Sequence, residues 1–227
     1  MSAPARGYLS MDPIMATSSE PLDDLLRRAS AGDSAALATL FTRYRERLRR
    51  MIHLRLDRRL TGRVDASDIL QEVYLEARTR MAAGGADPNL PFFLWLRLVA
   101  GQKLTDLHRR HLGTRMRDAG LEISLHRGAM PAASSASLAA QLLGTMTSAS
   151  QAAVRAEHRL IVQEALNGLD PIDREILVLR HFEYLSNDEA ALALGLKRSA
   201  ASQRYVRALK RLKDVLSTIP GLREELS

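Results

Sequence analysis

The apolar residues of this chain recur at intervals of three and four positions, the spacing of one face of an α-helix. Leu22, Leu25 and Leu26 begin the pattern, and a longer stretch of the same kind runs from Leu37 to Ile52. We find no segment with the strict alternation of apolar and polar residues that is typical of a half-buried strand. The pattern therefore predicts an all-α protein.

The helical pattern falls into two blocks separated by a segment of different composition. The residues from 128 to 154 contain no charged side chain and are dominated by Ala, Ser, Leu and Thr. Such a composition is typical of a linker. We therefore expect two small helical domains joined by a flexible linker. The expected division is 1–20 (disordered), 21–112 (first domain), 113–154 (linker), 155–217 (second domain) and 218–227 (tail).

Local signals divide the first block into successive helices. Asp65 is a suitable N-terminal cap, because its carboxylate can accept hydrogen bonds from the free N–H groups of a first turn. Residues 84–91 hold two glycines and two prolines, which predicts a loop. Pro91 then suits the first turn of a helix that we expect to continue to His111.

The second block carries the clearest local motif. Asp170 and the proline after it predict a helix start. Ser186 and Glu189 have the spacing of a capping box, in which each side chain accepts a hydrogen bond from the other residue's backbone N–H. Gly195 can adopt the left-handed conformation that a tight turn needs, and a longer helix is expected over residues 198–216. Short helix, glycine turn and longer helix together predict a helix-turn-helix motif.

One face of that longer helix is basic and polar. Its buried stripe is marked by Tyr205, Leu209 and Leu212. The other face combines arginine with serine and glutamine, side chains that can bind guanine, adenine and phosphate in a major groove. These residues are Arg198, Ser202, Gln203, Arg204 and Arg207. The motif therefore indicates binding to duplex nucleic acid.

The charge balance agrees with a polyanionic partner. Lys and Arg number 33 against 26 Asp and Glu, which gives a formal net charge of +7. The chain has no cysteine, which excludes disulfides, thiolate zinc sites and cysteine nucleophiles. We read no signal peptide in residues 1–20 and no apolar run long enough to span a bilayer. We therefore expect a cytoplasmic protein with no membrane insertion.

A catalytic or metal site finds little support in the sequence. His108 and His111 lie at helical spacing with Asp106 nearby, but no third ligand completes a metal motif. Histidines among arginines are more often surface residues than ligands. The sequence also shows no glycine-rich phosphate loop and no nucleophile motif. We therefore expect no metal, no cofactor and no enzyme activity.

Three segments, taken in order, resemble parts of bacterial sigma factors. Residues 65–77 look like region 2.2, residues 95–110 like region 2.3–2.4, and residues 185–212 like region 4. Regions 2 and 4 on either side of a linker are the layout of the extracytoplasmic-function (ECF) subgroup of the sigma-70 family, and this chain looks closest to its planctomycete members. The resemblance implies a factor that directs promoter-specific transcription initiation. Its partners would be the β and β′ subunits of core RNA polymerase, promoter DNA and, as for many members, an anti-sigma factor.

The same resemblance implies roles for the matching positions. The residues expected to dock on the β′ clamp helices are Asp65, Asp68, Gln71 and Glu72. The residues expected to contact the minus-10 element are Asn89, Arg97, Lys103, Arg109 and Arg110. The residues expected to contact the minus-35 duplex are Arg198, Ser199, Ser202, Gln203, Arg204 and Arg207. Capping by Asp65 is compatible with polymerase docking.

Some alternatives stay open at this level. A stand-alone helix-turn-helix regulator would explain residues 170–213 but would leave the resemblance of residues 65–72 and 95–110 unexplained. Trp95 suits a core position better than a stacking platform, because it lies in an apolar stripe. The uncharged linker fits either a passive tether or a segment that threads a polymerase channel near the nascent RNA. Gly101 departs from the family pattern, which usually has arginine there.

Overall fold

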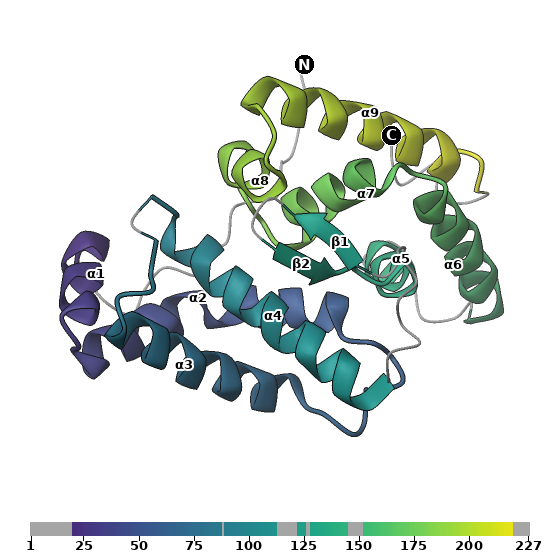
Figure 1. Ribbon diagram of the computed structural model, residues 1–227. Helices are drawn as coiled ribbons and strands as arrows, with labels where there is room; N and C mark the ends of the chain where they lie inside the picture. The colour runs from purple at the N-terminus through teal and green to yellow at the C-terminus, as the bar shows by residue number, and fades with distance from the viewer. Residues whose placement is uncertain (1–19, 88, 113–121, 126–127, 145–151, 220–227) are drawn as a thin grey trace, which may run out of the picture.

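The computed structural model describes residues 20–87, 89–112, 122–125, 128–144 and 152–219 (Figure 1). In these residues the chain is helical apart from one short two-stranded hairpin. The all-α fold class is therefore confirmed. None of the described helices is long and apolar enough to cross a membrane.

The first half of the chain is a bundle of helices in which α2 contacts all the others. The helices are α1 (Leu22–Ser30), α2 (Ser34–Arg55), α3 (Ala66–Ala82) and α4 (Phe92–Leu112). Asp65 caps α3 as expected, because its carboxylate accepts a hydrogen bond from the Ser67 backbone N–H at 2.7 Å. The facing apolar side chains form one core, which includes Leu25, Leu40, Leu48, Ile52, Leu70, Val73, Phe93, Leu96 and Leu104.

A hairpin that the sequence pattern did not predict follows α4. Strands β1 (Glu122–Leu125) and β2 (Gly128–Pro131) are antiparallel, with Glu122 opposite Pro131. Strand β2 lies on α4, where Met130 is buried against Gly101. A Cβ atom at position 101 would lie 2.4 Å from Met130 Cε, so an alanine there would force the Met130 side chain to move.

A short helix, α5 (Ser135–Gly144), lies within the expected linker. Leu138, Ala139 and Leu143 on this helix are buried. The backbone N–H of Ser134, just before α5, donates a hydrogen bond of 2.8 Å to the carbonyl of Leu54 in α2. The described part of the expected linker is thus packed, because uncharged Ala and Leu side chains are readily buried.

The second half consists of α6 (Ala152–Asn167), α7 (Pro171–Leu177), a π-helical turn η2 (Val178–Phe182), α8 (Asn187–Leu194) and α9 (Arg198–Leu216). Helix α9 packs along α7 and also contacts α6 and α8. The apolar core of this half extends onto α5 and includes Leu138, Leu143, Val162, Leu166, Leu177, Val178, Ala208 and Leu212.

The predicted helix-turn-helix is formed by α8 and α9. Ser186 and Glu189 make both hydrogen bonds of the capping box. Gly195 ends α8 with φ 65° and ψ 31°, a left-handed conformation that an L-residue with a side chain adopts at a cost. Ala191 and Ala201 are buried where the two helices meet. The capping box and the glycine turn are therefore confirmed, and small residues form the crossing of the two helices.

The two halves lie against each other, with the hairpin and α5 between them (Figure 1). Leu185 and Ala190 from the second half belong to the same apolar core as α2, α3 and α4 of the first half. The segment that makes this contact is irregular, because η2 is a π-turn and Tyr184 has a φ of 55°. The closed arrangement therefore depends on a segment with an uncommon backbone conformation.

Candidate nucleic-acid interface

The polar face of α9 points away from the core of the second half. Ala201, Ala208 and Leu212 on the opposite face are buried. The residues expected to contact the minus-35 duplex lie on the outer face, and all except the half-buried Arg204 are exposed: Arg198, Ser199, Ser202, Gln203, Arg204 and Arg207. Helix α9 thus carries the expected groups on one accessible surface.

Two of these arginines are held by an acid of their own half. Asp173 in α7 accepts hydrogen bonds from Arg204 Nη1 at 2.6 Å and from Arg207 Nε at 3.0 Å. Burial by itself raises the pKa of Asp173, but Arg207 and Arg204 outweigh it and hold the pKa below its ordinary value. Arg204 also lies 3.2 Å from Asp170. The first turn of α7 therefore fixes the direction of both guanidinium groups.

Helix α3 presents an acidic and amide-bearing surface. Asp68, Gln71 and Glu72, which the resemblance assigns to polymerase docking, are all exposed. Ile69 and Val73 on the opposite side are buried. Hydrogen bonding to the Ser67 backbone lowers the pKa of Asp65, which keeps this cap ionised. Asp65 is itself exposed, so its capping role leaves the carboxylate at the surface.

The outer face of α4 adjoins that of α3 and carries positive charge. Lys103 Nζ lies 3.0 Å from Glu76 on α3, and Arg110 lies 4.0 Å from Glu72. Arg109 is exposed nearby. Asn89 is exposed in the loop before α4, and its backbone N–H donates to Asp87 at 2.9 Å. These expected minus-10 residues are thus at least partly exposed on the first half.

Arg97 differs from the expectation of a side chain that contacts DNA. Its side chain is 1% exposed, and its Nε donates to Glu183 Oε2 at 2.6 Å. It points from α4 toward the second half of the chain rather than toward solvent. In this arrangement of the two halves Arg97 is unable to reach DNA.

Other expectations for this block concern aromatic and histidine side chains. Trp95 is buried and stacks on Phe92 with ring centroids 5.6 Å apart, which agrees with its expected core role. His108 is buried and its Nε2 accepts a hydrogen bond from the Asp57 backbone N–H at 3.3 Å. Among the described residues, no group of His, Cys, Asp and Glu is arranged to hold a metal ion.

A buried ion cluster at the junction of the halves was not anticipated. Arg55 and Arg97 come from the first half, and Glu175 and Glu183 come from the second. Arg55 Nη2 lies 2.5 Å from Glu175 Oε1, and its Nε lies 3.0 Å from Glu183 Oε1. Arg97 Nη2 donates to Glu175 Oε1 at 3.2 Å. The one sequence signal was a charged residue, Arg97, inside the apolar run of α4.

The electrostatics of this cluster are strongly coupled. Burial raises the pKa of Glu183, but the attraction of Arg55 and Arg97 is larger in sum and holds the pKa at about 2. Burial would lower the pKa of Arg55, and the two glutamates raise it above its ordinary value. Arg55 and Glu183 are therefore ionised at neutral pH.

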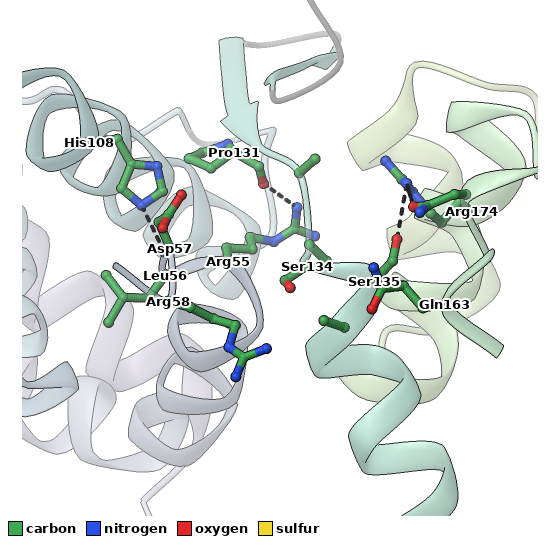
Figure 2. Close-up of a pocket in the computed structure, with 14 residues that line it drawn as sticks. Arg55, Leu56, Asp57, Arg58, His108, Pro131, Ser134, Ser135, Gln163 and Arg174 are labelled. Carbon is green, nitrogen blue, oxygen red and sulfur yellow. Dashed lines mark hydrogen bonds between the residues drawn. The ribbon is translucent and has the colours of Figure 1, made fainter. Parts of the chain in front are cut away.

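A cavity of about 350 Å³ lies beside the cluster, between α2, the linker, α6 and α7 (Figure 2). Figure 2 shows Asp57 and His108 on one side of it and Ser135 and Arg174 on the other. Arg174 Nη1 donates to Ser135 Oγ at 3.2 Å, and burial lowers the pKa of Arg174. Because its walls come from both halves and the linker, this cavity depends on the closed arrangement.

Known proteins resemble this chain over its second half and over nearly its whole length. Residues 159–212 match the family model described as "Sigma-70, region 4". The ECF RNA polymerase sigma factor SigD of Mycobacterium tuberculosis is 30% identical over 206 residues, which cover 91% of this chain and 89% of SigD. The RNA polymerase sigma factor NccH of Alcaligenes xylosoxydans xylosoxydans is 30% identical over 200 residues, 86% of this chain and 94% of NccH.

A solved structure shares the fold. CnrH, determined in complex with the cytosolic domain of CnrY, superposes with a TM-score of 0.52 at 24% identity, over 87% of this chain and 99% of CnrH. The order of the helices, the helix-turn-helix and the full-length similarity to SigD agree with one another. The chain belongs to the ECF group of sigma-70 factors, and it is a sigma factor that directs transcription initiation by RNA polymerase.

Proposed function

We propose that this sigma factor uses separate surfaces for core RNA polymerase and for the two promoter elements. The observation that carries the proposal is the placement of the expected residues: the acidic face of α3, the basic side of α4 and the polar face of α9 are all at the surface. Each face is backed by a buried apolar core that fixes its direction. Promoter DNA and a polymerase subunit could therefore be bound at once.

Helix α3 is the proposed docking element for the β′ clamp helices. Asp68, Gln71 and Glu72 supply the exposed contacts, and Asp65 shapes the start of the helix. Exposed charges of this kind set specificity and association rate more than they set affinity. Reversing two of them should therefore abolish productive docking without unfolding the first half.

The side of α4 is the proposed surface for the melted minus-10 strand, through Asn89, Lys103, Arg109 and Arg110. Melting requires no catalysis, because a protein that binds the single strand better than the duplex shifts the equilibrium toward the open form. Arg97 would join this surface only in a conformation in which the two halves are apart. We infer that the factor acts by binding alone and has no enzyme activity of its own.

The outer face of α9 is the proposed reader of the minus-35 duplex. Gln203 and Arg198 lie near the start of the helix, the part of a recognition helix that meets base edges in helix-turn-helix proteins. Arg204 and Arg207, oriented by Asp173, suit phosphate contacts. Replacing Gln203 by Ala should relax base preference at one position, whereas replacing Arg207 by Ala should weaken binding to all sequences alike.

Further parts of the proposal extend the family assignment. We propose that residues 21–112 act as region 2 and residues 155–217 as region 4, joined by residues 113–154. The likeness to planctomycete members stays a prediction. Because the protein acts on polymerase and DNA, we propose that it works in the cytoplasm. CnrH was solved bound to the cytosolic domain of CnrY, and we propose that a protein inhibitor, an anti-sigma factor, similarly restrains this chain.

Transcription from genomic fragments by core RNA polymerase, with and without the protein, tests this function. New discrete start sites should appear with the protein and disappear with the Asp68→Arg, Glu72→Arg variant. The matched control is Glu157→Arg, Glu164→Arg, which reverses two exposed acids on α6. A protein that gives no new starts, and binds duplex DNA tightly by itself, would instead be a stand-alone helix-turn-helix regulator.

A further inference from the structure

The buried ion cluster is satisfied only when the two halves of the chain meet. The first half supplies both arginines, Arg55 and Arg97, and the second half supplies both carboxylates, Glu175 and Glu183. Each of the four side chains is at most 1% exposed. Either half in isolation would carry two like charges without partners, and water would have to solvate them. The cluster is therefore an interface between halves and not part of either core.

The contacts are reciprocal. Each arginine binds both glutamates, so the cluster has no member that depends on a single partner. Arg55 Nη1 also donates to the carbonyl of Pro131 at 2.8 Å, which ties strand β2 into the junction. The linker, α2, α4 and the second half thus meet at one point.

Further contacts surround the cluster. Arg47 Nη2 donates to the Tyr184 carbonyl at 3.3 Å and lies 3.7 Å from Glu189, while its guanidinium lies 3.7 Å from the centre of the Phe93 ring. On another side, Leu192 of α8 lies beside Leu94 of α4. The interface has a buried ionic centre inside a partly apolar rim, which is the anatomy of a specific association.

The segment that carries Glu183 has an uncommon backbone. It follows the π-turn η2 and precedes Tyr184, whose φ of 55° is costly for a residue with a side chain. Such conformations persist where surrounding contacts over-determine them, and they gather in segments that switch. The contacts of Glu183 with both arginines are the interactions that offset this cost.

We propose that the second half of the chain is an internal partner of the first, and that the free protein rests in this closed state with Arg97 withheld from DNA. Closure is a property of the free chain and does not depend on any activity. The consequence for DNA rests on the proposed role of α4 in the minus-10 contact. A contact of Arg97 with the minus-10 strand then requires the halves to separate.

Ionic contacts suit a reversible closure. On separation each charged group regains its hydration, so a buried ion pair adds little net affinity relative to two hydrated ions. Neutralising only the glutamates has a larger effect, because the arginines then stay buried without partners in the closed state. In the open state the same arginines are hydrated, so only the closed state is destabilised. Replacing the glutamates should therefore open the protein while leaving both halves folded.

The conformational test uses fluorescence transfer in the full chain. Because the chain has no cysteine, Ala38→Cys on α2 and Lys210→Cys on α9, both exposed positions, accept a donor and an acceptor dye without competing sites. The labelled parent should show efficient transfer. With Glu175→Gln and Glu183→Gln, the ratio of closed to open molecules should fall by a factor of about 100 or more. The matched control, Glu157→Gln with Glu164→Gln on α6, should leave the ratio unchanged.

A second variant tests the closed state independently, in case the glutamine variant misfolds. Arg47 is partly exposed at the rim, so Arg47→Glu leaves the cores intact and places a carboxylate opposite Glu189. It should lower the closed-to-open ratio by a factor of about five. Helical circular dichroism and the fluorescence of Trp95 should stay at parent values for both variants. Transfer that neither variant changes, or a parent that is already open, would overturn the closed state.

Binding of a mixed-sequence single-stranded DNA oligonucleotide to the free protein tests the consequence. The glutamine variant should bind it at least about tenfold more tightly than the α6 control does, because Arg97 is then accessible. Opening without any gain in binding would overturn the claim that closure withholds Arg97. Loss of transcription by the Asp68→Arg, Glu72→Arg variant tests the proposed function separately, since that variant leaves the cluster untouched.

Discussion

Replacing Asp173 by Asn removes the negative charge that orients two arginines of the recognition helix. The Asp173 side chain is 3% exposed and accepts three hydrogen bonds, from Arg204 Nη1 at 2.6 Å and from Arg207 Nε and Nη2 at 3.0 and 3.2 Å. Asparagine has nearly the same shape, so the substitution tests the charge and not the packing. Its amide retains one oxygen that can accept, but its NH₂ group faces donors.

The magnitude follows from the burial of the partners. A hydrogen bond to a charged group contributes about 1.5–3 kcal/mol when it is buried. Arg204 and Arg207 are 29% and 57% exposed, so they recover part of their hydration when the carboxylate is lost. We therefore expect Asp173→Asn to lower the free energy of unfolding by about 2 kcal/mol.

Asp188→Asn is the matched control in the same half. Asp188 lies 2.9 Å from Arg198, another arginine of the recognition face, but the two side chains are 62% and 78% exposed. Surface pairs of this kind contribute little, so this change should lower the free energy of unfolding by less than about 0.5 kcal/mol. Both variants remove one negative charge that pairs with arginine, so the difference between them measures the effect of burial.

The assay is urea unfolding followed by far-ultraviolet circular dichroism at pH 7, repeated at lower pH. The pKa of Asp173 is lower in the folded state than its ordinary value of 3.8. The unfolded chain therefore takes up the proton first as the pH falls. The stability difference between parent and variant should be complete above about pH 4 and should shrink below it. Equal, small effects of both substitutions at pH 7 would refute the reasoning.

Three further predictions concern separate features of the fold. Gly101→Ala should lower the free energy of unfolding by about 1 kcal/mol or less in urea, because the new Cβ meets only the flexible end of Met130, and the cost should be smaller in a Met130→Ala background. Ser186→Ala removes one hydrogen bond of the capping box and should lower the free energy of unfolding, measured by thermal denaturation, by about 1 kcal/mol. Fluorescence transfer across the closed halves should persist down to about pH 4.5 and be lost as the pH approaches 2. The pKa of Glu183 is about 2 in the cluster and about 4.5 when the group is exposed, so Glu183 stabilises the closed state only while it is ionised.

Features encoded over a few residues were predictable from the sequence. The Asp65 cap, the capping box at Ser186 and the turn at Gly195 each depend on side chains within four positions of the backbone groups they serve. The outer face of α9 follows from helical spacing alone. The direction of Arg207 toward Asp173 did not follow, because it depends on how α7 and α9 cross.

Features that join distant residues were not predictable. The contacts of the ion cluster link residues 78 to 128 positions apart, and no local pattern states which arginine meets which glutamate. Arg97 was therefore assigned to DNA from the family resemblance, although it is buried. The hairpin was missed because four-residue strands are too short to show alternation.

Gly101 illustrates the same limit at a single position. In the sequence it was only a departure from the family pattern. In the structure it is the site where Met130 of β2 rests on α4, and a larger residue would occupy the same space. The reason for the departure lies 29 residues further along the chain, in a segment whose path no pattern near α4 describes.

The π-turn of η2 makes the spacing of this region unequally sensitive to gain and loss of a residue. Its hydrogen bonds span five residues rather than four, so it holds one residue more than an α-helical turn. Deleting one residue from Val178–Phe182 would therefore be absorbed by closing the wide turn to an α-helical one, which keeps Glu183 facing Arg55 and Arg97. An inserted residue has no such outlet and would rotate the following side chains by about 100°. At this point of the chain a one-codon deletion should be tolerated better than a one-codon insertion.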